Sequence, residues 1–208
     1  MKEYQKTFIE LAIESKALQF GSFTLKSGRL SPYFFNAANL LNSGKLDLLG
    51  ECYFEAFSEE DIDIHSIFGP AYKGIFLGSI LSLLLSKNNK AIPLSFNRKE
   101  IKDHGEGGNI IGDNPKGKTL IIDDVLSAGT AAKESIDLIK DVGAEPVMLL
   151  IGLDRKEKGS GDISASNELE LNYGIKIKSI IDLNLLIQFS KSDPNFEKYI
   201  NDLEDYRS

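Results

Sequence analysis

The chain has 208 residues, of which 42% are hydrophobic and 26% charged, a composition typical of a globular protein with one well-formed core. Its formal net charge of −7 argues against a nucleic-acid partner and against an anionic membrane surface. Cys52 is the single cysteine, which excludes an intrachain disulfide and a cysteine-based zinc site. No apolar run approaches membrane-spanning length, and Met1-Lys2-Glu3-Tyr4 lacks the apolar core of a signal peptide. We therefore expect a cytoplasmic protein.

The first part of the chain predicts two amphipathic helices with a hairpin between them. Apolar residues recur at helical spacing over residues 4–15 and again over 46–59. Within residues 20–36, Ser27-Gly28 separates two strand-like runs, which is a hairpin signal. This part does not follow an alternating strand–helix pattern, so residues 1–36 are predicted to form a small hood or flap.

From residue 63 onward, strand and helix patterns alternate. Strands are predicted over residues 63–68, 92–96, from Thr119, over 147–153 and over 175–181. Helices are predicted over residues 75–86 and 130–142, with Gly143 ending the second, and two short helices close the chain. This alternation predicts one domain over residues 1–208, with an α/β fold whose central sheet is mainly parallel and flanked by helices.

The stretch from Thr119 to Ala132 carries the strongest functional pattern. An apolar, partly β-branched run is followed by Asp123-Asp124, a turn of small residues, and a helical pattern from about Thr130. In α/β sheets the ligand lies at the carboxyl ends of the strands, and a helix that begins there offers unpaired N–H groups to a phosphate. The two acids would repel a phosphate, so we interpret them as acceptors for ribose hydroxyls. The pattern thus predicts a site for a ribose 5′-phosphate; the alternative is an ordinary strand–turn–helix with solvated acids.

Two glycine-rich patterns are rejected as nucleotide motifs. Residues 112–119 match G-x-x-x-x-G-K-[ST] letter for letter, but a P-loop must follow a strand and open a helix, whereas this segment leads into a strand. Residues 105–112 lack the third glycine of a dinucleotide fingerprint, because Ile110 occupies that position. We predict a turn before a strand at the first site and no dinucleotide site at the second.

Residues 97–109 contain three glycines and almost no apolar side chains. Arg98, Lys99, Lys102 and His104 are balanced there by acids, so the segment is not a basic patch in bulk. It is either a solvated surface loop or a mobile active-site loop that brings selected cations onto a pyrophosphate when it closes.

Two other cation-bearing loops follow predicted strands. Lys73, in the loop over residues 69–74, is placed for an anion; the alternative is a simple turn before a helix, with Tyr72 at its rim. Arg155 follows the strand over residues 147–153, and its guanidinium fork suits a carboxylate or a phosphate.

In the flap, Lys26 is within reach of a phosphate. Phe34-Phe35 are either core residues or a cover for a flat ring.

Four segments in register resemble the orotate phosphoribosyltransferases of the type I phosphoribosyltransferase family. They are residues 25–34, residues 69–74, residues 98–107 and the loop after Asp123-Asp124. The resemblance runs from the first helix to past Arg155. It implies the type I phosphoribosyltransferase fold and a reaction of orotate with phosphoribosyl pyrophosphate (PRPP). The products would be orotidine 5′-monophosphate and pyrophosphate, in the synthesis of UMP.

The resemblance also implies a role for each matching position. The ribose 5-phosphate would be cradled by Asp123, Asp124, Val125, Leu126, Ser127, Ala128, Gly129, Thr130 and Ala131. The pyrophosphate end would be bound by Lys26, Tyr72, Lys73, Arg98, Lys99, Lys102 and His104, with Lys102 as the catalytic residue. Orotate would be held by Phe34, Phe35, Ser127 and Arg155. Ser127 stands where many members of the family carry Thr, and its hydroxyl is retained.

Cofactor and partner follow from the same resemblance. The cofactor would be Mg²⁺, bound mainly through substrate oxygens and with no direct protein ligand. The loop over residues 97–109 would reach the active site of a second subunit, which implies a homodimer. The rival interpretations are another PRPP-dependent base phosphoribosyltransferase and a PRPP-sensing regulator that binds nucleic acid. Arg155 and the flap argue against the first, and the acidic chain argues against the second.

Overall fold

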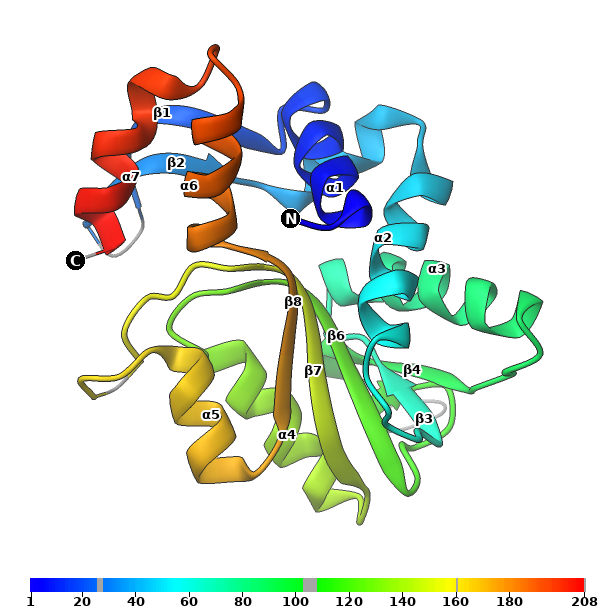
Figure 1. Cartoon of the computed structure of the whole chain (residues 1–208). Helices are drawn as coiled ribbons and strands as arrows, with labels where there is room; N and C mark the ends of the chain where they lie inside the picture. The colour runs from blue at the N-terminus through cyan, green and yellow to red at the C-terminus, as the bar shows by residue number, and fades with distance from the viewer. Residues whose placement is uncertain (26–27, 103–107, 160, 208) are drawn as a thin grey trace.

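A six-stranded sheet forms the centre of the computed structural model, which describes residues 1–25, 28–102, 108–159 and 161–207 (Figure 1). The strands are β1 Leu18–Thr24, β2 Leu30–Phe35, β3 Ser66–Phe68, β4 Leu94–Lys102, β5 Gly108–Ile111, β6 Lys118–Leu126, β7 Glu145–Asp154 and β8 Lys176–Asp182. The helices are α1 Glu3–Glu14, α2 Leu46–Ser58, α3 Lys73–Lys87, α4 Thr130–Asp141, α5 Ala165–Tyr173, α6 Leu183–Ser192 and α7 Ile200–Arg207. Short 3-10 helices occupy Ala37–Ser43 and Glu197–Tyr199.

The order of strands in the central sheet is β5-β4-β3-β6-β7-β8. Strand β3 pairs in parallel with β4 and β6, and β7 pairs in parallel with β6 and β8. Only β5, at one edge, runs antiparallel to its described neighbour β4. The prediction of a mainly parallel α/β sheet is confirmed. The parallel order also brings the carboxyl ends of β3, β6 and β7 to one edge of the sheet, where a ligand site is expected.

The two faces of the sheet bury separate apolar clusters. Because side chains alternate along a strand, Leu120 and Ile122 of β6 pack in one cluster and Ile121 packs in the other. Helices α1, α2 and α3 contribute to the first cluster, and α4 and α5 to the second. Figure 1 shows α4 and α5 together on one side of the sheet. Both faces are thereby covered, as a parallel sheet requires.

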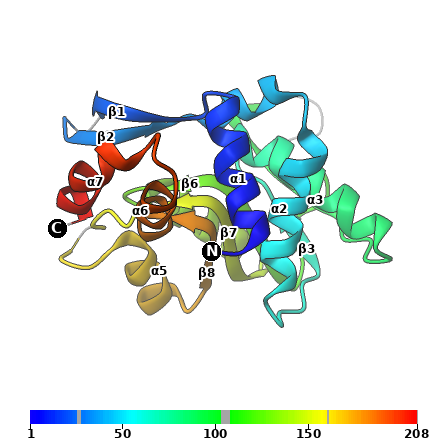
Figure 2. The ribbon, with the colours of Figure 1, turned by 45° about the horizontal axis from the view of Figure 1, so that its top comes forward.

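The predicted hood is a two-stranded antiparallel sheet of β1 and β2. Next to the connection between them, Leu25 N–H donates to the Arg29 carbonyl at 2.9 Å and Gly28 adopts a φ of +82°. Helices α6 and α7 lie beside this hairpin (Figures 1 and 2). The Phe20 ring of β1 stacks on Tyr199, with ring centroids 5.4 Å apart. The two ends of the chain therefore pack on each other.

The segment over residues 97–109 differs from the predicted loop. Residues 97–102 belong to β4 and residues 108–109 belong to β5, and the two strands pair antiparallel. Residues 103–107 lie outside the described part of the chain. The prediction of strands from apolar runs missed this antiparallel pair because strands at the edge of a sheet can leave a face exposed to solvent. The proposed motion of the segment stays a prediction.

Helix α5 was not predicted from the sequence. It buries Ala165 and Leu169 but presents charged and polar residues over most of its length, so its apolar periodicity is weak. The other predicted helices and strands agree with the structure to within a few residues. Among the helices of the described ranges, none has the length and apolarity needed to cross a membrane.

The segment that mimics a P-loop is a turn before β6, as predicted. Gly117 has a φ of +59°, and a Cβ placed there would lie 2.4 Å from His65 Nδ1. The same nitrogen accepts a hydrogen bond from Lys118 N–H at 3.0 Å. His65 therefore stabilises the turn into β6.

Candidate active site

The predicted ribose 5-phosphate site lies at the carboxyl end of β6. We call residues 123–131 the ribose-phosphate cradle; they run from the end of β6 into the first turn of α4. Gly129, at the N-cap of α4, adopts a φ of +83°, a conformation that favours glycine. The cradle borders a pocket of about 530 Å³ whose other lining residues are Ala132, Leu149 and Ile151. The first backbone N–H groups of α4 are thus available beside a cavity.

The two acids of the cradle have different surroundings. Asp124 is 5% exposed, and its Oδ2 lies 2.8 Å from Lys73 Nζ. Asp123 Oδ1 accepts a hydrogen bond from Asp124 N–H at 2.9 Å. Burial, reinforced by the neighbouring charge of Asp124, raises the pKa of Asp123 to about 8. The pair therefore holds a proton near neutral pH, which lowers its repulsion of a nearby phosphate.

The backbone of the acid pair is held from the face of the sheet that α2 covers, opposite the face that α4 covers. The Tyr53 hydroxyl, from α2, donates to the Asp123 carbonyl at 3.1 Å. Gly152 of β7 makes room for this contact, since a Cβ there would lie 2.8 Å from Tyr53 Oη and 3.0 Å from the Asp124 carbonyl oxygen. Sequence reasoning missed Tyr53, because an aromatic residue on the apolar side of a helix gives no sign that its hydroxyl reaches the site.

The loop after β3 meets the cradle through Lys73, the first residue of α3. Ala71 N–H donates to Asn97 Oδ1 of β4 at 2.7 Å, which fastens the loop to the next strand. Tyr72 is 72% exposed, and Lys99 Nζ lies 5.7 Å from the centroid of its ring. The structure therefore gathers Tyr72, Lys73 and Lys99 near the acids, and their predicted role at the pyrophosphate end stays a prediction.

Arg98 and Lys102 are also in β4, and Lys102 is its last residue. The Arg98 Nε atom is buried and has no hydrogen-bond partner in the described part of the chain. Such a donor is available to a bound anion. The predicted site residues Lys26 and His104 lie outside the described residues.

Arg155 lies beside the cradle, directly after β7. Its N–H donates to the Leu126 carbonyl at 3.1 Å, so the ends of β6 and β7 are joined at this point. Its guanidinium is nearly buried, and Nε lies 2.7 Å from Glu157 Oε1. It also borders a pocket of about 360 Å³ shared with Arg29 and Lys156. A charged donor group is thus held at the edge of a cavity, on the residue that follows β7 and is bonded to the ribose-phosphate cradle.

The overall arrangement is shared with known proteins. The family model described as the phosphoribosyl transferase domain matches residues 42–171. The chain belongs to the phosphoribosyltransferase family. Within that family its relatives include the orotate phosphoribosyltransferases of Marinobacter nauticus and Haemophilus influenzae, which are 51% and 47% identical to it. Each match covers 100% of this chain and 98% of the relative.

Solved structures agree with this assignment. A crystal structure of orotate phosphoribosyltransferase from Francisella tularensis superposes with a TM-score of 0.82 and is 36% identical, covering 96% of both chains. That of Aeropyrum pernix superposes with a TM-score of 0.71 at 26% identity, covering 88% of this chain and 98% of the other. The resemblance to the orotate phosphoribosyltransferases and to their type I fold is confirmed.

The two phenylalanines predicted for the base face different environments. Phe34 is 38% exposed, and its ring lies 5.6 Å from that of Phe23. Phe35 is buried, with its ring 6.3 Å from that of Phe8 in the core. Only the ring of Phe34 is therefore open to a flat ligand, and contacts from Phe35 would come through its backbone.

The acid pair also shows how the protein could help to hold the predicted Mg²⁺ ion. Within the described ranges, no group of three or more His, Cys, Asp or Glu side chains is arranged to hold a metal ion. The cradle offers two carboxylates, of which Asp124 is already paired with Lys73. This donor set fits a Mg²⁺ ion that a ligand's own oxygens hold, with little help from the protein.

Sequence reasoning also missed the residues that surround the Arg155 side chain. Its Nη2 donates to Ser31 Oγ and to the Tyr206 hydroxyl, each at 3.0 Å. Its guanidinium carbon lies 4.4 Å from the centroid of the Tyr33 ring. Glu157, two residues after Arg155, is the single partner that the local sequence suggests by charge. The others come from the two ends of the chain and leave no local signal.

Proposed function

We propose that this chain transfers the 5-phosphoribosyl group from PRPP to N1 of orotate, giving orotidine 5′-monophosphate and pyrophosphate. One observation carries the proposal: the ribose-phosphate cradle and Arg155 lie at neighbouring strand ends, joined by the bond from the Arg155 backbone N–H to the Leu126 carbonyl. The first fits the donor of the reaction, and the second fits the carboxylate of the acceptor. The full-length similarity to orotate phosphoribosyltransferases supports this assignment.

The cradle holds the ribose of PRPP. Asp123 and Asp124 accept hydrogen bonds from the ribose hydroxyls, and the N–H groups at the start of α4 bind the 5′-phosphate. Their task is orientation: the ribose carbon that bears the pyrophosphate must face N1 of the base in line with the leaving group. The acids are therefore positioning groups rather than general bases, since N1 of orotate attacks once it is deprotonated.

Cations assist departure of the pyrophosphate. As the bond to the ribose breaks, positive charge develops on the sugar and negative charge on the leaving group. Lys73 adjoins the acids that hold the ribose, and Lys99 and Arg98 follow on β4. We assign Lys102 to the departing pyrophosphate, where its ammonium offsets the developing charge, and Lys26 and His104 to the same end of PRPP.

Arg155 gives the site its choice of base. A guanidinium offers charged N–H donors to a carboxylate, so orotate is favoured over uracil, which has no carboxylate. The Phe34 ring covers the flat face of the base, and the Ser127 hydroxyl contacts its edge.

We further propose Mg²⁺ as the cofactor, a homodimer as the assembly and the cytoplasm as the location. When bound, the metal would supply positive charge that neutralises the departing pyrophosphate. In the homodimer, the segment over residues 97–109 of each subunit enters the site of its partner. The buried thiol of Cys52 suits a reducing compartment.

The assay for the proposed function mixes the protein, Mg²⁺, PRPP and orotate. Loss of orotate absorbance and release of pyrophosphate are followed together, with omission of PRPP as the control. Uracil, hypoxanthine and adenine replace orotate in parallel reactions. Turnover of orotate alone supports the proposal, whereas preferential turnover of another base would identify a different phosphoribosyltransferase. Tight nucleic-acid binding without turnover of any base would indicate a regulator.

Mixing two inactive variants tests the shared site. Lys102→Ala damages the segment that one subunit donates, and Asp124→Asn damages the pocket that receives it. A mixed dimer contains one intact site, so random mixing should restore about one quarter of wild-type activity. Restoration requires subunit exchange, which is checked by exchanging a tagged and an untagged wild-type protein. No restoration after proven exchange would show that each subunit uses its own Lys102.

A further inference from the structure

Tyr206, in the last helix α7, contacts the side chain of Arg155, which follows β7. The Tyr206 hydroxyl donates to Glu157 Oε1 at 2.6 Å and accepts from Arg155 Nη2 at 3.0 Å. Ser31 Oγ of β2 accepts from the same Nη2 atom, and Glu157 accepts from Nε. We call Arg155, Glu157, Ser31 and Tyr206 the Arg155 clamp. It joins β2, the segment after β7 and α7 in one hydrogen-bonded group.

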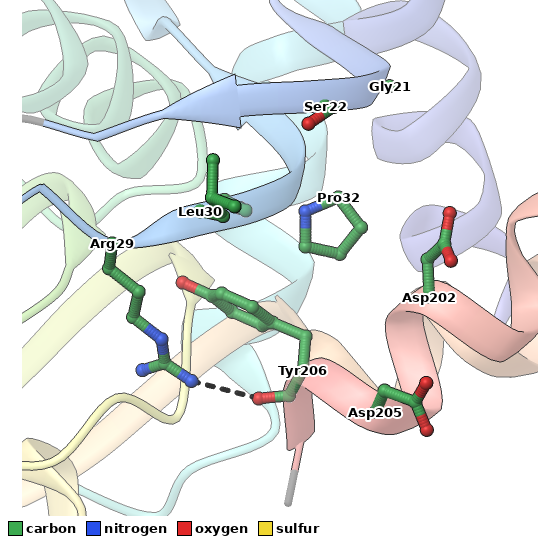
Figure 3. Close-up of a pocket in the computed structure, with 9 residues that line it drawn as sticks. Gly21, Ser22, Arg29, Leu30, Pro32, Asp202, Asp205 and Tyr206 are labelled. Carbon is green, nitrogen blue, oxygen red and sulfur yellow. Dashed lines mark hydrogen bonds between the residues drawn. The ribbon is translucent and has the colours of Figure 1, made fainter.

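Tyr206 is itself fixed by residues of the hairpin. Arg29 Nη2 donates to the Tyr206 carbonyl at 3.0 Å, a bond drawn in Figure 3. The Arg29 guanidinium carbon lies 4.1 Å from the centroid of the Tyr206 ring. The Tyr33 ring meets Tyr206 edge-on, with centroids 5.8 Å apart. The hydroxyl is therefore presented to Arg155 by a ring that cannot move freely, because two neighbours and its own backbone hold it.

The clamp occupies one half of the guanidinium. Its bonds use Nε and Nη2, while Nη1 takes part in none of them. An arginine side chain has several rotatable bonds, and fixing them beforehand removes an entropic cost from binding. A carboxylate that arrives at the remaining N–H groups thus meets a donor that already has its orientation.

We propose that Tyr206 and Ser31 are positioning residues that orient Arg155 for the carboxylate of the base. This inference rests on the proposed function, in which that carboxylate belongs to orotate. It assigns the last helix of the chain a part in substrate recognition, although Tyr206 need not touch the substrate. The competing explanation is that α7 only covers the hairpin, in which case loss of the Tyr206 hydroxyl would change stability alone.

The test compares Tyr206→Phe with Tyr199→Phe in the full-length protein. Tyr206→Phe keeps the ring and removes the hydroxyl that bridges Arg155 and Glu157. We expect the KM for orotate to rise about 5- to 20-fold, with kcat and the KM for PRPP within twofold of wild type. Tyr199 stacks on Phe20 in the same C-terminal region, so Tyr199→Phe controls for loss of a tyrosine hydroxyl there. It should leave all three constants unchanged.

Ser31→Ala provides an independent variant, because it removes the other acceptor of Nη2. It should raise the KM for orotate by a similar factor, and it decides the question if Tyr206→Phe proves unstable at the assay temperature. An unchanged KM for orotate in folded Tyr206→Phe, or a rise in the KM for PRPP of the same size, would overturn the inference. If the wild-type protein does not use orotate, the proposed function itself fails, which is a separate and recognisable outcome.

Discussion

The ribose-phosphate cradle and the Arg155 clamp are built in opposite ways. The cradle takes all its groups from one continuous strand–turn–helix, residues 123–131. The clamp takes its groups from distant parts of the chain: Arg155 is 124 residues from Ser31 and 51 residues from Tyr206. A site that binds a common ligand fragment can therefore be compact in sequence. The site that we propose to select the base depends instead on the packing of both chain ends.

The two regions also differ in electrostatics. The clamp pairs a cation with an anion, Arg155 with Glu157, at 2.7 Å. The cradle places two carboxyl groups side by side and neutralises only one of them directly, through Lys73. The charges of the clamp are therefore paired as they stand, with only Nη1 outside its bonds, whereas the cradle has capacity left for hydroxyl donors from a ligand. Variants in the two regions should consequently affect different substrates.

The largest effect is expected outside both regions, at Lys102 in β4. If the cradle and the clamp only bind and orient, the departing pyrophosphate needs another cation. We expect Lys102→Ala to lower kcat by about 100- to 1,000-fold, with the KM for PRPP changed only a few-fold. Steady-state kinetics with saturating orotate measures both constants. Lys116→Ala, at an exposed lysine, is the matched control. Near-normal turnover of Lys102→Ala would remove this residue from the chemistry.

Arg155→Lys should separate the functions of the two regions. Lysine keeps the positive charge but lacks the planar guanidinium, so it cannot bond the clamp residues and the substrate carboxylate at the same time. We expect kcat/KM for orotate to fall about 10- to 100-fold and PRPP affinity to stay within twofold. Equilibrium binding of PRPP to the same variant is the internal control. Equal losses for both substrates would show that the cradle and the clamp act as one unit.

The sequence was sufficient for the parts of the molecule in which neighbours along the chain are also neighbours in space. The order of helices and strands, the cradle and the hairpin could be predicted because each depends on local periodicity, on turn residues or on one helix start. Gly129 and Gly143 fell at turns with positive φ, as their positions suggested. The four segments in register with a known family added the substrate assignment.

The parts that could not be predicted depend mostly on contacts between residues that are far apart in the sequence. Nothing near Tyr53 shows that its hydroxyl reaches the Asp123 carbonyl, 70 residues away. Tyr206 looks like any aromatic residue of a short terminal helix. A strand was predicted over residues 92–96, but the extension of β4 over residues 97–102 and its pairing with β5 were missed because these residues carry little apolar pattern, and α5 was missed because only a narrow stripe of it is buried.

The acid pair of the cradle should make stability depend on pH. The pKa of Asp123 is raised to about 8 in the folded protein, against an ordinary value of 3.8 in the unfolded chain. The folded state therefore binds more protons between these values, and stability is lost as pH rises from about 4 through about 8. Asp123→Asn mimics the neutral acid. Its free energy of unfolding should exceed that of wild type above pH 8, by up to about 1.4 kcal/mol for each pH unit of this range, and the difference should vanish below pH 4.

Urea unfolding across this pH range measures the effect. Asp137→Asn makes the same chemical change at an exposed position of α4 and should leave the pH dependence of wild type intact. If Asp123→Asn keeps the full wild-type slope, the proton is not on this pair.

The smallest effect is expected at Tyr53, which joins the cradle to α2. Tyr53→Phe removes the donor to the Asp123 carbonyl and keeps the ring in the core, so it should cost about 1 kcal/mol of stability. For a chain of this length, that shifts the midpoint of thermal unfolding by about 2–4 °C. Tyr173→Phe on α5, away from the acids, is the control. Because the bond fixes backbone under the acids, the KM for PRPP should rise by about twofold while the KM for orotate stays constant. A rise for orotate instead would mean that the core behind β6 supports the clamp rather than the cradle.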